Sequence, residues 1–582
     1  MLPPDARAIV TDSLRPPSGS VLDHAVATTF TLDLASALAV PLAFTAYQIR
    51  ENPDPLSVME AARASVDRVD VFCQAGNISA PAKDSGLLSF LEPMIHPVRA
   101  PRPGRLFHPK LWLLRYRDGN GLYPFRLVVL SRNLTADQCW DTCLRLDGVR
   151  GTRPHASNRP LADLLKALPG MSVNGLDEFR TSRLNQLAEE IRYVVWELPE
   201  DILKLRFHAL GIRGAKVPDF TGSRHLIISP FCTETGLGIT APAPTGAVTL
   251  VGRQEELDRL PETALQRCGG TLVVNELASV PPDGAEPTQA LLSGLHAKVY
   301  VVEKGQRARL FVGSANATDA AFSGNVELLV ELEGSKWKVG IDSLVGKDAA
   351  FRAILEPYNR QAPQEEDSAE LALEHLLRDL ATVPMAAAVE PDPPSMSLLL
   401  TSEDAIDAPA NVRITAELLT KPGQARQLVA GEPVRVSYEN LAVVDITPFV
   451  VLRASAGGKE RTTVIRVRLV GDPPGRLDEV LAAQVNTPEK FLQFLSLILG
   501  LVDGLSLQPA PTTKGNGAWG SGTGAGVFEL LVRSLVDRPA ALADLARLVE
   551  RLRATEQGRG LLPEGFAAIW DAVDEVRMEL SS

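Results

Sequence analysis

The chain has 582 residues, with 59 Lys and Arg against 71 Asp and Glu, and a formal net charge of −12. This balance argues against a protein coated in basic surface, and the length suffices for three or four domains. Five cysteines without a CxxC pair argue against a disulfide framework and a zinc site, and they favour a reducing cytoplasm.

The first long apolar run covers residues 25–47 and contains Asp33 and Pro41. No basic flank precedes it, so it predicts neither a signal peptide nor a membrane-spanning helix. A strand that leads into a buried helix is the better interpretation. We therefore expect a cytoplasmic protein without membrane association.

The strands and helices that follow carry a first motif. His108-x-Lys110 stands at the head of an apolar strand, and a second strand over residues 125–130 leads to Ser131-x-Asn133. Alternate side chains of a strand point to the same face, so His108 and Lys110 should face one pocket.

Basic residues gather around this motif. Residues 99–132 contain eight Lys or Arg and one acid, Asp118. A positive patch beside a phosphate pocket would suit a polyanion such as nucleic acid. The alternative is a solvated loop that happens to be rich in Arg. The candidates for contacts with nucleic acid are Arg102, Arg105, Arg117 and Arg132.

The same motif recurs 188 residues further on, as His296-x-Lys298, a strand over residues 309–312, and Ser314-x-Asn316. Two copies in the same order indicate a duplicated half-site. With the alternation of strands and helices, they predict an α/β fold of two pseudo-symmetric halves. Each half should be a mixed sheet with helices on both faces, and the pocket should lie on an approximate twofold axis. We place the halves at residues 1–205 and 206–358.

The residue types of the motifs suit phosphoryl chemistry. An imidazole, an ammonium, a hydroxyl and an amide form a half-shell for a phosphate, and two half-shells would hold a phosphodiester between two imidazoles. One His can attack phosphorus while the other protonates the leaving oxygen, and the Lys and Asn side chains stabilise the charge. This chemistry requires no metal and no other cofactor.

An attacking imidazole also needs a partner that presents its correct nitrogen. In the second half Glu327 would share a strand face with Asn325, and in the first half Asp141 stands at a comparable place. The alternative for both is a surface carboxylate, and it is stronger for Asp141 than for Glu327.

At these residues the chain resembles the phospholipase D superfamily, whose motif is His-x-Lys followed by Asp. The second copy has Gly313 before its Ser and fits well, although Glu303 occupies the Asp slot. In the first copy Arg115 occupies that slot and Leu130 replaces the Gly. A His-x-Lys with a later Asn and no Asp is similar to the tyrosyl-DNA phosphodiesterase branch, as are residues 133–140.

The resemblance implies a covalent phosphohistidine, with His108 as the nucleophile and His296 as the general acid. It also implies that Glu327 orients a catalytic His. Residues 22–33 resemble bacterial members that accompany helicases in phage-defence or restriction loci. That similarity implies a helicase or other ATPase as a partner, and a role in anti-phage defence.

The chain changes character after the second half. Residues 359–395 are acidic and then Pro-rich, which predicts a linker with one helix. Residues 396–475 alternate like strands and predict a small β-sandwich. Residues 476–582 are mainly helical and contain a Gly-rich stretch at 514–526, which lacks the strand and Gly-Lys-Ser of a phosphate-binding loop and predicts a flexible linker. We expect any oligomer to form through this C-terminal region.

The leading hypothesis is a metal-independent phosphodiesterase that cleaves nucleic acid. One alternative is a catalytically degenerate scaffold that binds nucleic acid or a partner, which the imperfect first motif favours. Against it, both copies retain their His, Lys, Ser and Asn. A second alternative is a phospholipid phosphodiesterase or transferase, against which the Arg-rich stretch and the absence of a secretory segment argue.

Overall fold

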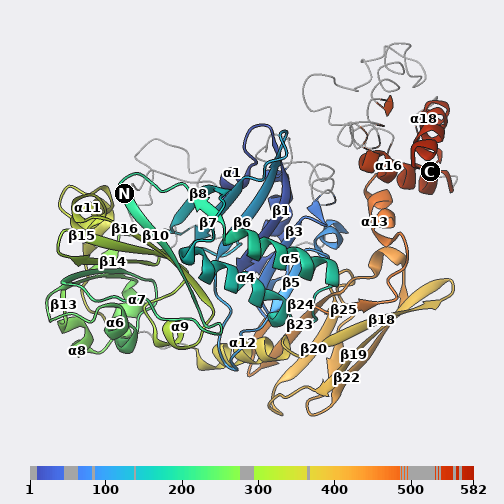
Figure 1. Ribbon diagram of the computed structural model, residues 1–582. Coiled ribbons are helices and arrows are strands. Elements are labelled where there is room, and N and C mark those ends of the chain that lie inside the picture. Colours follow the sequence, from blue (N-terminus) through green and yellow to red (C-terminus); the bar gives the residue numbers. More distant parts are fainter. Residues whose placement is uncertain are drawn as a thin grey trace, which may run out of the picture.

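The computed structural model describes most of the chain (Figure 1). The Gly-rich linker predicted at 514–526 lies outside the described residues. The described residues are 10–44, 63, 65–81, 86–136, 139–275, 294–363, 367–485, 487, 491, 495, 531–532, 535, 539–554, 559–562 and 566–581.

The first half forms a seven-stranded mixed sheet. Its strands lie in the order β5 (Ile95–Val98), β3 (Val69–Gln74), β1 (Ser20–Thr29), β6 (Leu111–Asp118), β7 (Phe125–Leu130), β8 (Cys143–Arg150) and β9 (Val194–Trp196). The β1–β3 and β3–β5 pairs are parallel, and the other pairs are antiparallel.

Helices cover both faces of this sheet, because successive apolar side chains of its strands point to opposite faces and each face must be buried. Leu111 and Leu113 of β6 pack with α4 (Arg159–Met171) and α5 (Glu178–Ile191), whereas Trp112 and Leu114 pack with α2 (Leu34–Ala43) and the 3-10 helix η1 (Gly86–Leu91). The shorter elements of this half are α1 (Val10–Leu14), β2 (Leu32–Asp33), β4 (Ile78–Ser79) and η2 (Ala156–Asn158).

The second half forms an eight-stranded sheet. Its strands lie in the order β10 (Ile202–Leu210), β16 (Glu327–Ser335), β15 (Arg307–Gly313), β14 (Val299–Lys304), β11 (Arg224–Ile228), β12 (Val248–Gly252), β13 (Cys268–Val274) and β17 (Leu355–Pro357). The helices of this half are α6 (Glu234–Thr240), α7 (Gln254–Arg259), α8 (Glu262–Gln266), α9 (Asp319–Ser323), α10 (Lys336–Val339), α11 (Ile341–Val345) and η4 (Ala350–Ile354).

The two sheets repeat one strand order. The series β5-β3-β1-β6-β7-β8 corresponds to β13-β12-β11-β14-β15-β16, with two parallel pairs followed by three antiparallel ones in each half. The repeat extends to single hydrogen bonds, since the Thr29 hydroxyl accepts from the Leu134 N–H at 3.0 Å and the Ser229 hydroxyl accepts from the Ala317 N–H at 3.0 Å. The predicted α/β fold of two pseudo-symmetric halves is confirmed.

The halves share one apolar core. A single buried cluster joins residues of α4 and α5 to β10, β14, β15 and β16 of the second sheet. The boundary predicted at 205–206 falls inside β10, because this strand already begins at Ile202 and pairs along β16.

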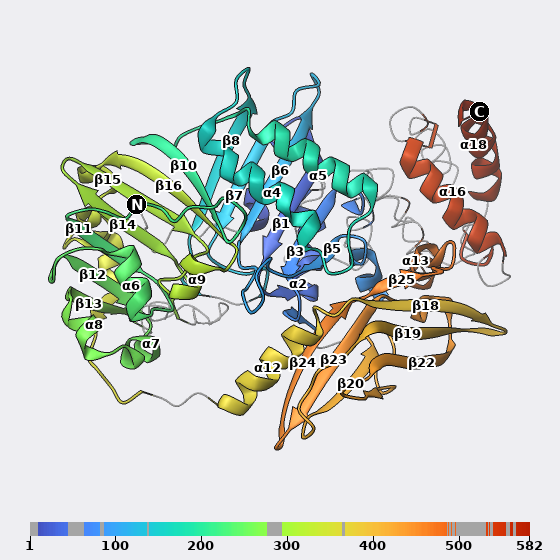
Figure 2. The ribbon, with the colours of Figure 1, turned by 60° about the horizontal axis from the view of Figure 1, so that its bottom comes forward.

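The C-terminal part begins with α12 (Ser368–Leu380) and a β-sandwich of two four-stranded sheets. Figure 2 shows the sandwich beside the first half, where Phe449 and Val464 join the core under α2. One sheet has the order β22 (Pro433–Leu441), β19 (Ser395–Ala405), β18 (Met385–Asp392) and β25 (Arg468–Val470), and the other has β21 (Arg426–Leu428), β20 (Arg413–Leu418), β23 (Phe449–Ala456) and β24 (Lys459–Arg466).

Strand β18 lies within the residues assigned above to a linker. Within the Pro-rich stretch 390–395, residues 390–392 end β18 and Pro393 and Pro394 form the hairpin turn to β19, with Asp392 paired to Ser395. Proline at a hairpin end and proline in a linker look alike in sequence. A 3-10 helix, η5 (Val443–Asp445), and three helices complete the described chain, α13 (Arg476–Gln484), α16 (Pro539–Ala554) and α18 (Phe566–Ser581). None of the helices in this described part is long and apolar enough to cross a membrane.

Candidate active site

The two motifs occupy equivalent ends of the two sheets. Lys110 immediately precedes β6 and Ser131 immediately follows β7, and Lys298 and Ser314 stand in the same way at β14 and β15. Because the paired strands are antiparallel, the start of one meets the end of the next. The Leu130 N–H donates to the Lys110 carbonyl at 2.9 Å, which fixes this meeting point in the first half.

The halves are bound to each other at these ends. Phe107 bridges Val326, and the His108 N–H donates to the Val326 carbonyl at 2.9 Å. In return, Leu295 bridges Trp140, and the His296 N–H donates to the Trp140 carbonyl at 2.6 Å. Each His is therefore positioned by backbone from the opposite half, and the two motifs meet.

A buried carboxylate orients His108. Its Nδ1 lies 2.9 Å from Glu327 Oε2, and the Glu327 side chain is only 1% exposed. The Ser314 hydroxyl donates to the same carboxylate oxygen and accepts from the Leu328 N–H at 3.0 Å. With Nδ1 engaged, His108 presents Nε2 for reaction.

Asp141 behaves differently from Glu327. Its carboxylate lies 3.5 Å from Arg132 Nε, and burial raises the pKa of Asp141. Among the described residues, no hydrogen bond joins Asp141 to His296, whose Nδ1 instead lies 3.3 Å from Lys298 Nζ. The orienting contact expected of Asp141 is thus not formed, because the shorter side chain is held by Arg132.

The site holds an excess of positive groups. Lys110 and Lys298 are both buried, and their Nζ atoms donate to the carbonyls of His108 and His296 at 3.0 and 2.8 Å. Burial lowers the pKa of Lys110 to about 7, and burial together with the charge of Lys110 lowers the pKa of Lys298 well below its usual value.

The imidazoles respond in the same direction. Burial lowers the pKa of His108 to about 4, with Glu327 opposing this effect and Lys110 adding to it. Burial and the charges of Lys298 and Lys110 lower the pKa of His296 to about 2. Two lysines and two imidazoles therefore lie around the Glu327 carboxylate, and a bound oxyanion would favour their protonated forms.

The two Asn side chains have unused polar atoms. Asn133 Oδ1 and Asn316 Oδ1 are buried, and neither has a hydrogen-bond partner in the described part of the structure. Ser131 is engaged by the Thr142 N–H, which donates to its hydroxyl at 2.7 Å. An amide oxygen only accepts, so these two atoms would suit a donor on a ligand, whereas a phosphate oxygen would have to be met by the NH2 group of each Asn.

The Asp slot of the motif lies away from the site in both halves. Arg115 binds Asp23 and Glu190 at 2.6 and 2.7 Å, and Glu303 binds Arg224 at 3.1 Å. The slot is five residues beyond each Lys, about 16 Å along an extended strand. Its charge is reversed between the halves, and in each half it forms an ion pair with a neighbouring element.

The predicted basic patch is not a single patch. Arg117 lies seven residues along β6 from Lys110, roughly 23 Å away at the usual strand rise, so it does not flank the site. Arg126 lies near the same far end and is paired with Asp147 at 2.5 Å. Because an extended strand moves residues that are close in sequence far apart in space, the cluster of basic residues in the sequence does not form one patch in the structure.

Three of the four predicted nucleic-acid-binding arginines do lie near the motifs. Arg102 donates to the Ser323 carbonyl at 2.6 Å, and Arg105 lies against Gly324, both next to the Val326 bridge. Arg132 follows Ser131 directly and pairs with Asp141 as described.

Two further residues at the site were not predicted. Gln74 ends β3 and its Oε1 accepts from the Phe107 N–H at 2.7 Å, and Arg253 follows β12 and its Nε donates to the Leu295 carbonyl at 2.7 Å. The two positions are equivalent in the repeat, and each holds the residue before a catalytic His candidate. The available signal was a polar residue at the carboxyl end of a buried strand.

Three of the histidines outside the motifs, His24, His96 and His225, are buried and hydrogen-bonded. His24 and His96 bind the two oxygens of Asp70 at 3.0 and 2.8 Å, and His225 lies 2.8 Å from the Phe220 carbonyl.

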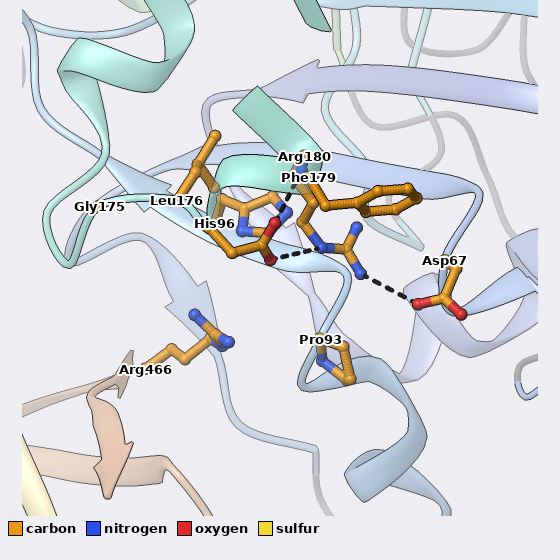
Figure 3. Close-up of a pocket in the computed structure, with 9 residues that line it drawn as sticks. Asp67, Pro93, His96, Gly175, Leu176, Phe179, Arg180 and Arg466 are labelled. Carbon is orange, nitrogen blue, oxygen red and sulfur yellow. Dashed lines mark hydrogen bonds and ion pairs between the residues drawn. The ribbon is translucent and has the colours of Figure 1, made fainter. Parts of the chain in front are cut away.

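A separate cavity of about 310 Å³ lies near His96, where β3 begins rather than where it ends at Gln74 (Figure 3). It contains no residue of either motif. The residues that line it are Asp67, Pro93, His96, Gly175, Leu176, Asp177, Phe179, Arg180 and Arg466, of which Figure 3 labels all except Asp177.

Comparison with solved structures finds two mutant forms of yeast tyrosyl-DNA phosphodiesterase, each 10% identical with a TM-score of 0.35. The matches cover 56% of this chain and 85% and 86% of those chains. Polyphosphate kinase from Porphyromonas gingivalis matches at 11% identity and a TM-score of 0.30, over 64% of this chain and 50% of that one. No model of a known protein family matches, and no curated protein is similar in sequence. Similarity at this level carries no argument about activity, which must come from the site.

Proposed function

We propose that this protein is a metal-independent phosphodiesterase of the phospholipase D type that cleaves nucleic acid. The observation that carries the proposal is the meeting of two His-x-Lys segments, each held by backbone of the opposite half, with one carboxylate on His108 Nδ1. Two imidazoles, two lysines and two Asn side chains, whose NH2 groups can donate to phosphate oxygens, suit a phosphodiester.

In the proposed first step His108 Nε2 attacks phosphorus. The bond from phosphorus to the leaving oxygen breaks, and His296 gives its proton to that oxygen. Glu327 stabilises the positive charge that develops on His108. The phosphate brings negative charge beside the two lysines and two imidazoles, so it raises the pKa of His296 and favours its protonated form.

In the second step water attacks the phosphohistidine. His296 takes the proton from water, the bond from water oxygen to phosphorus forms, and the bond to His108 breaks. Lys110 and Lys298, with Asn133 and Asn316, stabilise the remaining phosphate oxygens in both steps.

The test is hydrolysis of labelled single- and double-stranded DNA and RNA in excess EDTA, with any partner ATPase left out. We expect cleavage by the wild-type protein and none by the His108→Ala variant. Complete loss in EDTA with rescue by magnesium would refute the mechanism. Binding without cleavage of any substrate would favour a scaffold, and cleavage of phospholipid alone would favour a lipid enzyme.

We further propose a cytoplasmic role in anti-phage defence beside a helicase or other ATPase, with the C-terminal region as the contact or oligomerisation surface. This proposal rests on the resemblance of residues 22–33 alone. The genes next to this one test it, since a locus without an ATPase would argue against such a partner.

A further inference from the structure

One exposed aromatic residue lies beside the second half of the site. Phe231 is 39% exposed, although large apolar side chains are usually covered. Its carbonyl accepts from the Ser229 hydroxyl at 2.7 Å, and that hydroxyl in turn accepts from the Ala317 N–H at 3.0 Å. Because Ala317 follows Asn316 directly and also bridges Cys232, the backbone of Phe231 is fixed to the second motif.

A guanidinium group packs on this ring. Arg253 lies 5.4 Å from the centre of the Phe231 ring, and its Nε is held by the Leu295 carbonyl at 2.7 Å, one residue before His296. The charge of Arg253 also contributes to the lowered pKa of His296, which places the pair within electrostatic reach of the reacting centre. The ring and its cation are thus anchored to both segments of the second motif.

The first half has no equivalent surface among its described residues. In the loop that corresponds, Phe30 is half-buried and packs edge-on against His108 with ring centres 5.2 Å apart. The position equivalent to Arg253 is the neutral Gln74, which is buried. Phe30 also has a cation near its ring, Lys110 Nζ at 5.8 Å from the ring centre. Next to the site, among the described residues, the His296 side therefore differs in having a more exposed ring that is backed by an Arg instead of by the Lys of the motif.

We propose that Phe231, backed by Arg253, is a stacking platform for one unpaired nucleobase next to the scissile phosphate, on the side of the leaving group. This inference rests on the proposed function and narrows its substrate to single-stranded nucleic acid. Both faces of a base inside a duplex are covered by its neighbours, so only an unpaired base can stack on the ring. The negative phosphate beside that base is attracted by Arg253.

The experiment is a double-mutant cycle in which one change removes the Phe231 ring from the protein and the other removes the bases from the substrate. Wild-type protein and Phe231→Ala are compared on a single-stranded oligonucleotide and on the same strand with abasic sites flanking the scissile phosphate. We expect wild type to prefer the strand with bases by roughly 10- to 100-fold in kcat/KM, the range of one stacked base. Phe231→Ala should lose that preference and match wild type on the abasic strand. Phe231→Trp should restore it.

The chain offers a matched control. Tyr123 is 44% exposed and carries Arg115 at 5.4 Å from its ring centre, but it lies at the far end of β6 and β7. Tyr123→Ala should keep the full preference for bases. If Phe231→Ala keeps that preference too, or slows both strands equally, the platform is wrong.

Binding separates this inference from the nuclease proposal. The same two strands are titrated into His108→Ala and into His108→Ala combined with Phe231→Ala, without turnover. Binding that favours bases and depends on Phe231 would support the platform even if no cleavage is found, in which case the nuclease proposal alone fails. Binding by His108→Ala that ignores the bases would overturn the platform, whatever the cleavage assay gives.

Discussion

In the first half, the His108 segment rests beside Glu327, which binds the imidazole at 2.9 Å, whereas in the second half the His296 segment rests beside Asp141, which turns to Arg132. The backbone bridges on the two sides are equivalent, and the side-chain contacts are not. The two halves therefore share the same backbone path, whereas the side chains around His108 and His296 have diverged and can serve different roles. An attacking imidazole benefits from a fixed tautomer, and an imidazole that exchanges its proton benefits from a changeable environment.

The largest effect should come from exchanging the two histidines for inert residues. His108→Ala should lower turnover by about 10⁴-fold or more and leave no phosphoenzyme, because it removes the nucleophile. His296→Asn should let the intermediate form and slow its release. Acid quenching and trapping of a label that is acid-labile and base-stable measures both. Label found on His296 in the wild-type protein would reverse the assignment of the two roles.

Removing the charge of Glu327 should slow turnover more than removing the charge of Asp141. Glu327→Gln should reduce kcat by about 10²- to 10⁴-fold, since it disturbs the tautomer of His108 and the stabilisation of its positive form. Asp141→Asn should remain within about tenfold of wild type, because Asp141 does not bind His296. Steady-state kinetics with circular dichroism as a folding control checks the pair. Equal losses in the two variants would mean that the halves share the orienting task.

Proton uptake on binding an oxyanion should reveal the lowered pKa values of the two lysines. The pKa of Lys110 is about 7, so at pH 7 its side chain takes up roughly half a proton when a bound oxyanion raises that pKa. Lys298, whose pKa is lowered well below its usual value by burial and by the charge of Lys110, should add to this uptake. Calorimetry of vanadate binding in buffers of different ionisation enthalpy measures the uptake. Lys110→Met and Lys298→Met should each reduce the uptake, and binding without proton uptake would contradict the lowered pKa values.

The smallest effect concerns stability. Gln74→Leu leaves the buried Phe107 N–H without its acceptor and should destabilise the fold by about 1–3 kcal/mol. Arg253→Leu should lower the free energy of unfolding by less. Arg253 is only half-buried, so water can replace its guanidinium group at the Leu295 carbonyl. Urea unfolding compares the two variants. A larger loss in Arg253→Leu would show that the second half depends more on its anchor than the first.

Much of this arrangement could be predicted from the sequence because strands impose a simple rule. Two copies of His-x-Lys and Ser-x-Asn beside apolar strands are enough to predict two sheets and one shared site. Arg117 was misplaced because a strand carries neighbours in sequence far apart. Gln74 and Arg253 escaped notice because their equivalence exists only in the sheet, where β3 and β12 hold the same place. Strand β18 was hidden by the prolines of its turn.

The bridges from Phe107 to Val326 and from Trp140 to Leu295 cross between the halves in opposite directions. A hinge that opened the halves would break both bridges and also the contact of His108 with Glu327. Domain closure is therefore not available as a way to assemble this centre, and substrate must enter a site whose walls are already set. During synthesis the first half leaves the ribosome without the strand that carries Glu327, the partner of His108. The contacts of His108 with Val326 and Glu327 can form only when β16 has been made and has joined the sheet.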